Sequence, residues 1–253
     1  MIKQNDVFSA VGTKCTHYGA PLVNGVLYKN KISCPWHGAT FCVTTGDIED
    51  FPGCDSLHIH QVTVKGSDVF VRVKHNDLSQ KYRVKALSPH NPSNVLTFVV
   101  VGGGPSGLQC ADTLRQQGFT GRVVMITSED TYPYDRTKLS KAMNTKVEEI
   151  LLRSKDYFKT ADIEVLVNTS VNKLDSKTKS IELNNGSKLS FDRIFLGTGV
   201  RPKKYDVKGS QLKNICYLRT HSDANLIAQN AVDKDVVIIG TSFIGIQNNL
   251  ILK

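Results

Sequence analysis

The fold of the larger part of this chain is decided by one stretch, Leu96-Thr97-Phe98-Val99-Val100-Val101-Gly102-Gly103-Gly104-Pro105-Ser106-Gly107. Its unbroken apolar run is typical of a central strand in a parallel sheet. The glycines follow a G-x-G-x-x-G pattern, in which Gly102 permits a tight turn, Gly104 lets the backbone approach a pyrophosphate, and Gly107 lets a helix pack closely on the strand. We therefore expect a strand, a glycine turn and a helix that ends near Gly118.

The turn predicts a dinucleotide site, to which Pro105 and Ser106 also belong. The first turn of a helix offers unpaired N–H groups and partial positive charge to an anion. A second strand, Arg122–Thr127, leads to Glu129 and Asp130, about twenty residues on, where an acidic side chain binds ribose hydroxyls in such folds. Glu129 is the first choice for this role and Asp130 the second, because the register is uncertain by one or two residues.

Two short loops near the start of the chain each carry one cysteine and one histidine. They read Cys15-Thr16-His17-Tyr18-Gly19-Ala20 and Cys34-Pro35-Trp36-His37-Gly38-Ala39. Two thiolates and two imidazoles can hold either zinc or a [2Fe–2S] cluster. Structural zinc sites usually keep like ligands together in one loop, whereas here each loop can give one ligand to each of two irons.

These loops resemble the Rieske cluster-binding motif, with Gly19 and Gly38 allowing tight backbone near the sulfurs. The resemblance implies that Cys15 and Cys34 hold one iron and that His17 and His37 hold the other. High-potential Rieske proteins carry two further cysteines that bridge the loops. Ala20 and Trp36 stand at those positions here, so the chain resembles the ferredoxin-like, lower-potential branch.

The remaining cysteines predict no second redox centre. Cys42, Cys54, Cys110 and Cys216 show no Cys-x-x-Cys spacing, and we read them as buried small hydrophobes or exposed thiols. An iron–sulfur cluster with free thiols also indicates a reducing compartment.

Two later segments resemble FAD-dependent pyridine-nucleotide oxidoreductases of the ferredoxin-reductase type. The first, residues 132–141, reads Tyr-Pro-Tyr-Asp-Arg-Thr-Lys-Leu-Ser-Lys. By this resemblance Arg136 would help to hold the phosphates or the adenosine side of FAD, and Lys141 would lie near the isoalloxazine ring as a candidate catalytic residue. The alternative for this segment is an ordinary basic surface helix.

The second segment, residues 191–202, is a strand followed by Gly197-Thr198-Gly199. In the family this turn marks the crossing between FAD and NAD subdomains, so Thr198 and Gly199 would lie near the flavin nucleotide. The alternative is a simple turn that ends the strand.

A second strand-and-glycine pattern closes the chain. The run Asp235–Ile239 predicts a buried strand, and Gly240 and Gly245 match the first and last glycines of the family's NAD(P)H-binding turn. Ser242 replaces the middle glycine, and Gln247 stands where such reductases often have glutamate. Both departures weaken the prediction of nicotinamide binding at this turn.

Rieske and FAD/NAD segments in this order resemble the apoptosis-inducing-factor-like, Rieske-containing branch of the flavoprotein reductases. The resemblance implies a multidomain chain: a small all-β Rieske module followed by an incomplete α/β Rossmann-like FAD/NAD(P)-binding domain. We expect the module in residues 1–76, a linker in 77–94 and the second domain in 95–253. We also expect the strands before the first cluster loop, and the end of the NAD and interface regions, to be missing.

The implied function is an oxidoreductase that passes electrons from NAD(P)H through FAD to the [2Fe–2S] cluster. One alternative is a non-catalytic Rieske electron carrier or interaction fragment with a possible apoptosis-related role. A third is a partial gene product without the activity of its family. The electron acceptor, the choice between NADH and NADPH and the oligomeric state cannot be read from the sequence.

Composition sets the remaining bounds. The 253 residues are 40% hydrophobic and 22% charged, which is typical of a globular protein of about two domains. Lys and Arg exceed Asp and Glu by 32 to 23, but they are dispersed, so we do not expect nucleic-acid binding. We find neither an apolar run of about twenty residues nor a signal peptide. An intracellular location, cytoplasmic or mitochondrial, is the resulting expectation.

Overall fold

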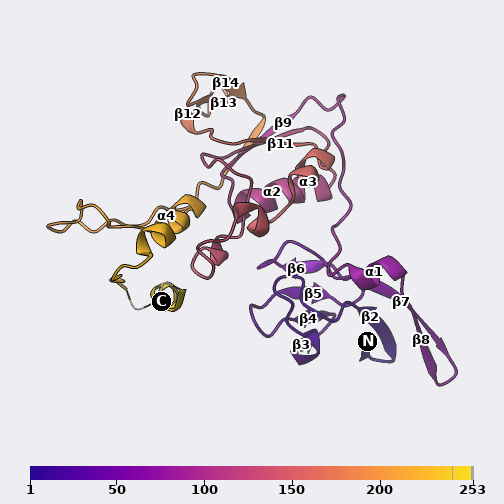
Figure 1. Ribbon diagram of the computed structural model, residues 1–253. Coiled ribbons are helices and arrows are strands. Elements are labelled where there is room, and N and C mark those ends of the chain that lie inside the picture. The colour runs from indigo at the N-terminus through magenta and orange to yellow at the C-terminus, as the bar shows by residue number, and fades with distance from the viewer. Residues whose placement is uncertain (241, 252–253) are drawn as a thin grey trace. The chain divides into compact units, whose positions relative to one another are not determined.

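The computed structural model describes residues 1–240 and 242–251. The chain divides into two compact units, Met1–Ala86 and Leu87–Lys253 (Figure 1). The division falls inside the segment that we expected to be a linker, and each unit is described by itself.

The first unit is built from two antiparallel four-stranded sheets (Figure 1). One has the order β1-β2-β7-β8, with strands at Ile2–Gln4, Val7–Val11, Ile59–Lys65 and Asp68–Arg72. The other has the order β3-β4-β5-β6, with strands at Val26–Tyr28, Lys31–Ser33, Thr40–Cys42 and Ile48–Asp50. A 3-10 turn, η1, spans Leu22–Asn24, and the helix α1 spans His75–Ser79.

Our expectation that no leading strands precede the first cluster loop is wrong. Strands β1 and β2 lie before Cys15 and pair as a hairpin. Asn5 and Asp6 connect them with φ angles of 45° and 62°. Asparagine and aspartate tolerate this left-handed conformation, which two-residue hairpin turns require, so the polar start of the chain is a turn signal.

Part of the expected linker is ordered against the first unit. The backbone of Arg83 forms a bridge with Ser56, and its side chain donates to the carbonyl oxygens of Thr45 and Leu57. Arg83 also pairs with Asp47. These contacts hold the chain after α1 on the β-rich unit as far as residue 83.

The second unit is organised around a parallel sheet with the order β11-β10-β9-β15. Its strands are Thr97–Val101 (β9), Arg122–Ile126 (β10), Ile163–Leu166 (β11) and Arg193–Leu196 (β15). The central β9 pairs with β10 and β15, and its Val99 and Val100 are fully buried. Helix α2, Pro105–Gln116, follows β9 as the glycine pattern predicts.

Smaller elements complete this unit. An antiparallel sheet contains β12, β13 and β14 at Val171–Asp175, Ser180–Leu183 and Lys188–Ser190. The helices are α3 (Lys155–Thr160), α4 (His221–Ala231) and α5 (Phe243–Ile251), with 3-10 turns η2 (Arg136–Lys138) and η3 (Val147–Ile150).

The prediction of a buried strand at Asp235–Ile239 is wrong for this structure. The segment is irregular, and Val237 and Ile239 are 86% and 78% exposed. A strand requires a neighbour that pairs with its backbone, and no described strand pairs with this run. Apolar composition alone therefore did not produce a strand.

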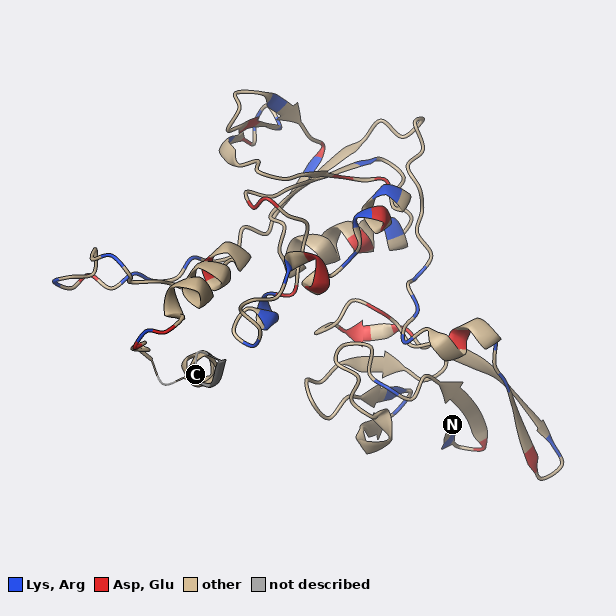
Figure 2. Ribbon diagram, in the orientation of Figure 1, with Lys and Arg blue, Asp and Glu red and all other residues tan. Residues whose placement is uncertain are grey.

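Positively and negatively charged residues are interspersed along the chain in both units (Figure 2). Among the described residues, no helix has the length and apolar content needed to cross a bilayer.

Candidate cluster loops and nucleotide site

The two Cys/His loops have the same backbone geometry. In the first loop, the N–H of Cys15 donates to Ala20 O at 2.8 Å and the N–H of Gly19 donates to Cys15 O at 2.9 Å. In the second loop, Cys34 donates to Ala39 O at 2.8 Å and Gly38 to Cys34 O at 3.2 Å. A turn of this shape is therefore repeated around each cysteine.

Glycine is required at the same place in both loops. Gly19 and Gly38 have φ angles of 76° and 73°, a left-handed conformation that other residues adopt at a cost. The alanines that close the loops are buried, at 1% exposure for Ala20 and 0% for Ala39, in the core of the first unit. Ala20 thus fills a packed position where a bridging cysteine would otherwise stand.

The fold sorts the four candidate ligands by chemical type. The Cys15 thiol lies within hydrogen-bonding reach of the Cys34 sulfur. The rings of His17 and His37 lie 5.0 Å apart between centroids, at 74° to each other. Each loop therefore contributes one member to a sulfur pair and one to an imidazole pair, which is the allocation that a Rieske cluster uses.

The buried thiols fit a cationic cluster. Burial raises the pKa of Cys15, the backbone N–H groups of His17 and Tyr18 oppose that rise, and the neighbouring Cys34 adds to it. Two adjacent buried thiolates repel each other, so bound iron would supply the positive charge that lets both ionise. The N–H donors would remain as hydrogen bonds to the bound sulfur.

The spread of the ligands favours two irons over one zinc. Within the described part of the chain, no three Cys, His, Asp or Glu side chains converge as a single metal ion requires. A tetrahedral zinc needs four ligand atoms around one point, whereas a diiron cluster takes one pair at each end. The zinc alternative therefore fits this arrangement less well.

The surroundings of the histidines differ. A Cβ on Gly53 would lie 3.2 Å from His17 Cβ, so a third loop packs against this residue. His37 is exposed and follows Trp36, which is 59% exposed. The second loop thus presents its imidazole to the surface.

In the second unit, the glycine turn at residues 102–107 packs against the turn Gly197-Thr198-Gly199 that follows β15. A Cβ on Gly102 would overlap the carbonyl of Gly197 and lie 3.2 Å from Thr198 N. Gly102 has a φ of 125°, and Gly197 in turn lies close to Gly107. The turns at 102–107 and 197–199 lie far apart in the sequence, but their backbones form one surface in the structure.

Gly104 is the open position of this surface. It is the N-cap of α2, and a Cβ there would meet nothing within 4 Å. The exposed Pro105 and Ser106 follow it in the first turn of α2. Open space beside the helix N-terminus is where a pyrophosphate would approach, so the residues present fit FAD.

Glu129 is linked to the same turn by Thr127. A Cβ on Gly103 would clash with the Thr127 side chain, and the Thr127 hydroxyl accepts the N–H of Glu129 at 3.2 Å. Gly103 and Thr127 were not singled out in the sequence, because the motif leaves both positions free. Asp130 is exposed, in contrast to the half-buried Glu129.

Arg136 and Tyr134 hold the Glu129 carboxylate. Arg136 forms an ion pair with it, and the Tyr134 hydroxyl lies 2.5 Å from its Oε2. Burial opposes the charge of Arg136, but its contacts with Glu129 outweigh this and raise its pKa. Arg136 Nη1 also donates to Arg219 O at 3.2 Å. The Arg136 guanidinium thus contacts Glu129, the acidic residue expected to bind ribose, as well as Tyr134 and the backbone of Arg219.

Residues at the start of α4 complete the site and were missed in the sequence. The N–H of His221 donates to the Tyr134 hydroxyl at 3.0 Å, and a Cβ on Gly199 would lie 3.1 Å from Arg219 Nη2. Thr220 and Asp223 form a capping box at this helix start. The Thr-x-x-Asp spacing was the available signal for the helix, although not for its contact with Tyr134.

Lys141 is exposed and follows η2, so the segment is a short 3-10 turn rather than a basic surface helix. The neighbouring Ser140 is buried and donates to Gln247 Oε1 at 2.8 Å. Gln247 belongs to α5, after the second glycine turn. The structure thus places the second turn's helix against the segment that carries Lys141.

The second glycine turn repeats the geometry of the first. Gly240 has a φ of 119°, and a Cβ on Gly245 would overlap the Gly240 carbonyl as one on Gly107 would overlap that of Gly102. The middle position is Ser242, which is exposed. The backbone geometry of the first glycine turn is therefore found again at Gly240 and Gly245, although the run before Gly240 is not a strand.

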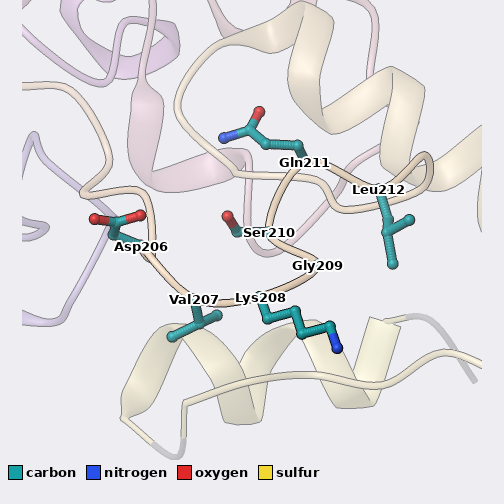
Figure 3. Close-up of a pocket in the computed structure, with 7 residues that line it drawn as sticks. All are labelled: Asp206, Val207, Lys208, Gly209, Ser210, Gln211 and Leu212. Atoms are coloured by element: carbon teal, nitrogen blue, oxygen red, sulfur yellow. The ribbon is translucent and has the colours of Figure 1, made fainter.

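The loop Asp206–Leu212 lines an open hollow of about 500 Å³ (Figure 3). Seven consecutive residues of this one loop line it, and none of them is a predicted cofactor residue. The glycine turns and the hollow are thus different places in the second unit.

Comparison with known proteins agrees with both halves of this description. Residues 96–251 match the family "Pyridine nucleotide-disulphide oxidoreductase", and residues 1–75 match "Rieske [2Fe-2S] domain". Apoptosis-inducing factor 3 from Homo sapiens is 42% identical over 98% of this chain, and its Mus musculus counterpart is 40% identical over the same share. The chain spans 42% of the length of each of these relatives.

The second unit also resembles solved reductases. A ferredoxin reductase for the CYP199A2 system from Rhodopseudomonas palustris aligns with a TM-score of 0.59 and 30% identity, over 62% of this chain and 39% of that one. Putidaredoxin reductase, in its covalent complex with putidaredoxin, aligns with a TM-score of 0.58 and 29% identity, over 63% and 40%.

The Rieske domain implies a [2Fe–2S] cluster, and the oxidoreductase domain implies FAD and NAD(P)H. Both the fold class and the resemblance inferred from the sequence are confirmed. The chain belongs to the pyridine nucleotide-disulphide oxidoreductase family and carries a Rieske domain ahead of its oxidoreductase domain.

Proposed function

We propose that this chain is the cofactor-bearing part of an oxidoreductase that passes electrons between NAD(P)H, FAD and a [2Fe–2S] cluster. One observation carries the proposal: a sulfur pair and an imidazole pair on twin loops occur in the same chain as a glycine turn with open space at Gly104. When bound, FAD would supply the conversion between a two-electron hydride donor and one-electron transfer.

The residues of the first unit would hold and tune the cluster. Cys15 and Cys34 would bind one iron from within the core, and His17 and His37 would bind the other nearer the surface. Backbone N–H groups of His17 and Tyr18 directed at the Cys15 sulfur would stabilise its negative charge. Hydrogen bonds to cluster sulfurs are one of the means by which a protein sets a cluster potential.

The residues of the second unit would orient the flavin nucleotide. Gly102, Gly104 and Gly107, with Pro105 and Ser106, would receive the pyrophosphate at the start of α2, and Glu129 would accept from the ribose. Thr198 and Gly199 would line the same surface. Lys141 would lie near the flavin ring, and Gly240 and Gly245 would take part in NAD(P)H binding.

The visible absorption spectrum of the anaerobically reconstituted 253-residue chain tests the proposal. Flavin bands superimposed on iron–sulfur absorption, both bleached by NADH or NADPH, are the expected result. Iron–sulfur absorption that neither nucleotide changes, together with an absence of bound flavin, would contradict it.

That second outcome would favour the other candidate, a Rieske electron carrier on a scaffold that does not bind flavin. The observation behind this candidate is the exposed irregular run before Gly240, which leaves the NAD(P)H site without a strand in the described residues.

The electron acceptor is proposed by chemical class only. Relatives of the second unit include the ferredoxin–NAD(+) reductase subunit of a benzene 1,2-dioxygenase system from Pseudomonas putida, 36% identical over 58% of this chain and 36% of its own length. A small one-electron iron–sulfur protein is therefore the acceptor class to test first. We further propose a reducing intracellular compartment, in keeping with the six free cysteines.

A further inference from the structure

The buried Tyr134 hydroxyl contacts the Glu129 carboxylate. This hydroxyl lies 2.5 Å from Glu129 Oε2, 2.9 Å from Arg136 Nη1 and 3.0 Å from the backbone nitrogen of His221. The side chain is 2% exposed and belongs to a core cluster with residues of α4. The hydroxyl therefore makes three protein hydrogen bonds in a buried setting.

The direction of these hydrogen bonds follows from donor chemistry. A guanidinium and a backbone N–H can only donate, so the Tyr134 oxygen accepts from both Arg136 and His221. Its single proton must then go to the Glu129 carboxylate. Burial and the bond to Glu129 also raise the pKa of Tyr134, so the hydroxyl keeps the proton that it donates.

A count of hydrogen bonds also shows how many acceptor sites stay free on the Glu129 carboxylate. A carboxylate has about four lone-pair sites. Arg136 Nη2 occupies one on Oε1, while Tyr134 and, at 3.4 Å, Arg136 Nη1 occupy two on Oε2. About one site on Oε1 remains. The Tyr134 hydroxyl has no proton left for a ligand, so of these two side chains only Glu129 has a free site for a sugar hydroxyl.

We propose that Tyr134 is a positioning residue: it fixes the Glu129 carboxylate so that Oε1 accepts from a ribose hydroxyl of the bound adenine nucleotide. This inference rests on the proposed FAD site and adds the residue that makes the site selective for a sugar with its hydroxyl group. His221 and Arg136 act in turn on Tyr134, which connects the start of α4, 87 residues further along the chain, to nucleotide selection.

The test measures the preference of the 253-residue chain for ADP over 2′,3′-dideoxy-ADP by titration calorimetry. ADP contains the phosphates and sugar of the FAD adenosine half, and the dideoxy compound lacks only the hydroxyls in question. Because a hydrogen bond to a charged group is involved, we expect the unchanged chain to prefer ADP by about tenfold or more. Tyr134→Phe should reduce this preference to below about threefold.

Tyr157→Phe is the matched control. Tyr157 also donates to a buried carboxylate, Asp112 at 3.1 Å, and burial raises its pKa in the same way. The substitution removes the same atom from the same unit, at the Asp112 carboxylate rather than at Glu129, and should leave the ADP preference unchanged. Both nucleotides report on the same folded fraction, so the ratio stays interpretable if a variant is less stable.

Three outcomes are informative. Loss of the preference in Tyr134→Phe, with its retention in Tyr157→Phe, supports the inference. A full preference in Tyr134→Phe, or an equal loss in both variants, overturns it and leaves the nucleotide site standing. Failure of the unchanged chain to bind either nucleotide overturns the inference together with the proposed FAD site.

Discussion

The carbonyl oxygen of Gly102 occupies the space that a Cβ on Gly107 would need. At this point the turn after β9 touches the first turn of α2 backbone to backbone, and an added methyl group must push the two apart. We expect Gly107→Ala to destabilise the second unit by about 1–3 kcal/mol, as overpacking does in other cores. Urea unfolding of the two proteins measures this difference, and equal midpoints would show that the turn can adjust.

Gly104→Ala should weaken nucleotide binding and leave stability almost unchanged. Gly104 has a φ of −92° and open space around it, so alanine fits without strain and stability should change by less than about 1 kcal/mol. The added methyl group would stand where the pyrophosphate approaches. We expect ADP binding, measured by calorimetry, to weaken at least about tenfold. Unchanged affinity would place the phosphates elsewhere.

Cluster assembly should require both the sulfur pair and the imidazole pair, and one residue of each pair is changed to test this. We expect Cys34→Ser and His37→Ala to lose most of the iron and acid-labile sulfide, because each removes one of two ligands to one iron. The exposed Cys216 provides the control, since Cys216→Ser should keep about two irons per chain. If the unchanged chain binds zinc in place of iron, this would instead support the alternative of a single zinc site.

The buried ion pair between Asp112 and Arg153 should matter more than an exposed one. These side chains are 1% and 5% exposed and 3.2 Å apart, whereas Arg122 and Glu164 are 46% and 43% exposed. Arg153→Met leaves a buried carboxylate without its cation, at a cost of about 3–5 kcal/mol. Arg122→Met should cost no more than about 1 kcal/mol. Comparable losses in urea unfolding would contradict this ranking.

The first unit should lose stability in acid partly through Asp47. Burial would raise the pKa of Asp47, but Arg83 and Lys85 outweigh it, and the pKa lies below its ordinary value. A carboxyl group with a depressed pKa stabilises the fold above its unfolded pKa of about 4, and this contribution disappears as the pH falls further. The stability difference between the unchanged chain and Asp47→Asn should therefore be present at pH 6 and shrink below about pH 4.

Comparing the two proteins at each pH removes acid effects that they share, including any loss of the cluster. A difference that is constant from about pH 6 to about pH 3 would show that Asp47 keeps the same proton state in the folded and unfolded chains.

Local sequence was sufficient for the elements that short-range geometry determines. The apolar run before Gly102 became β9, and α2 begins directly after the glycine turn as the pattern predicts. The Cys/His spacing also placed both loops correctly, because each turn closes within six residues. The hairpin at Asn5 and Asp6 carried a local signal too, but its polar composition concealed it.

Tertiary structure alone decided the rest. Apolar composition at Asp235–Ile239 did not make a strand, since pairing depends on a neighbour that lies elsewhere in the chain. Likewise, no local pattern could join Tyr134 to His221, which lies 87 residues further along the chain. The sequence by itself determined which groups were available and which turns could form. Which groups meet was decided by packing between segments far apart in the chain, because that packing depends on every strand and helix folding together.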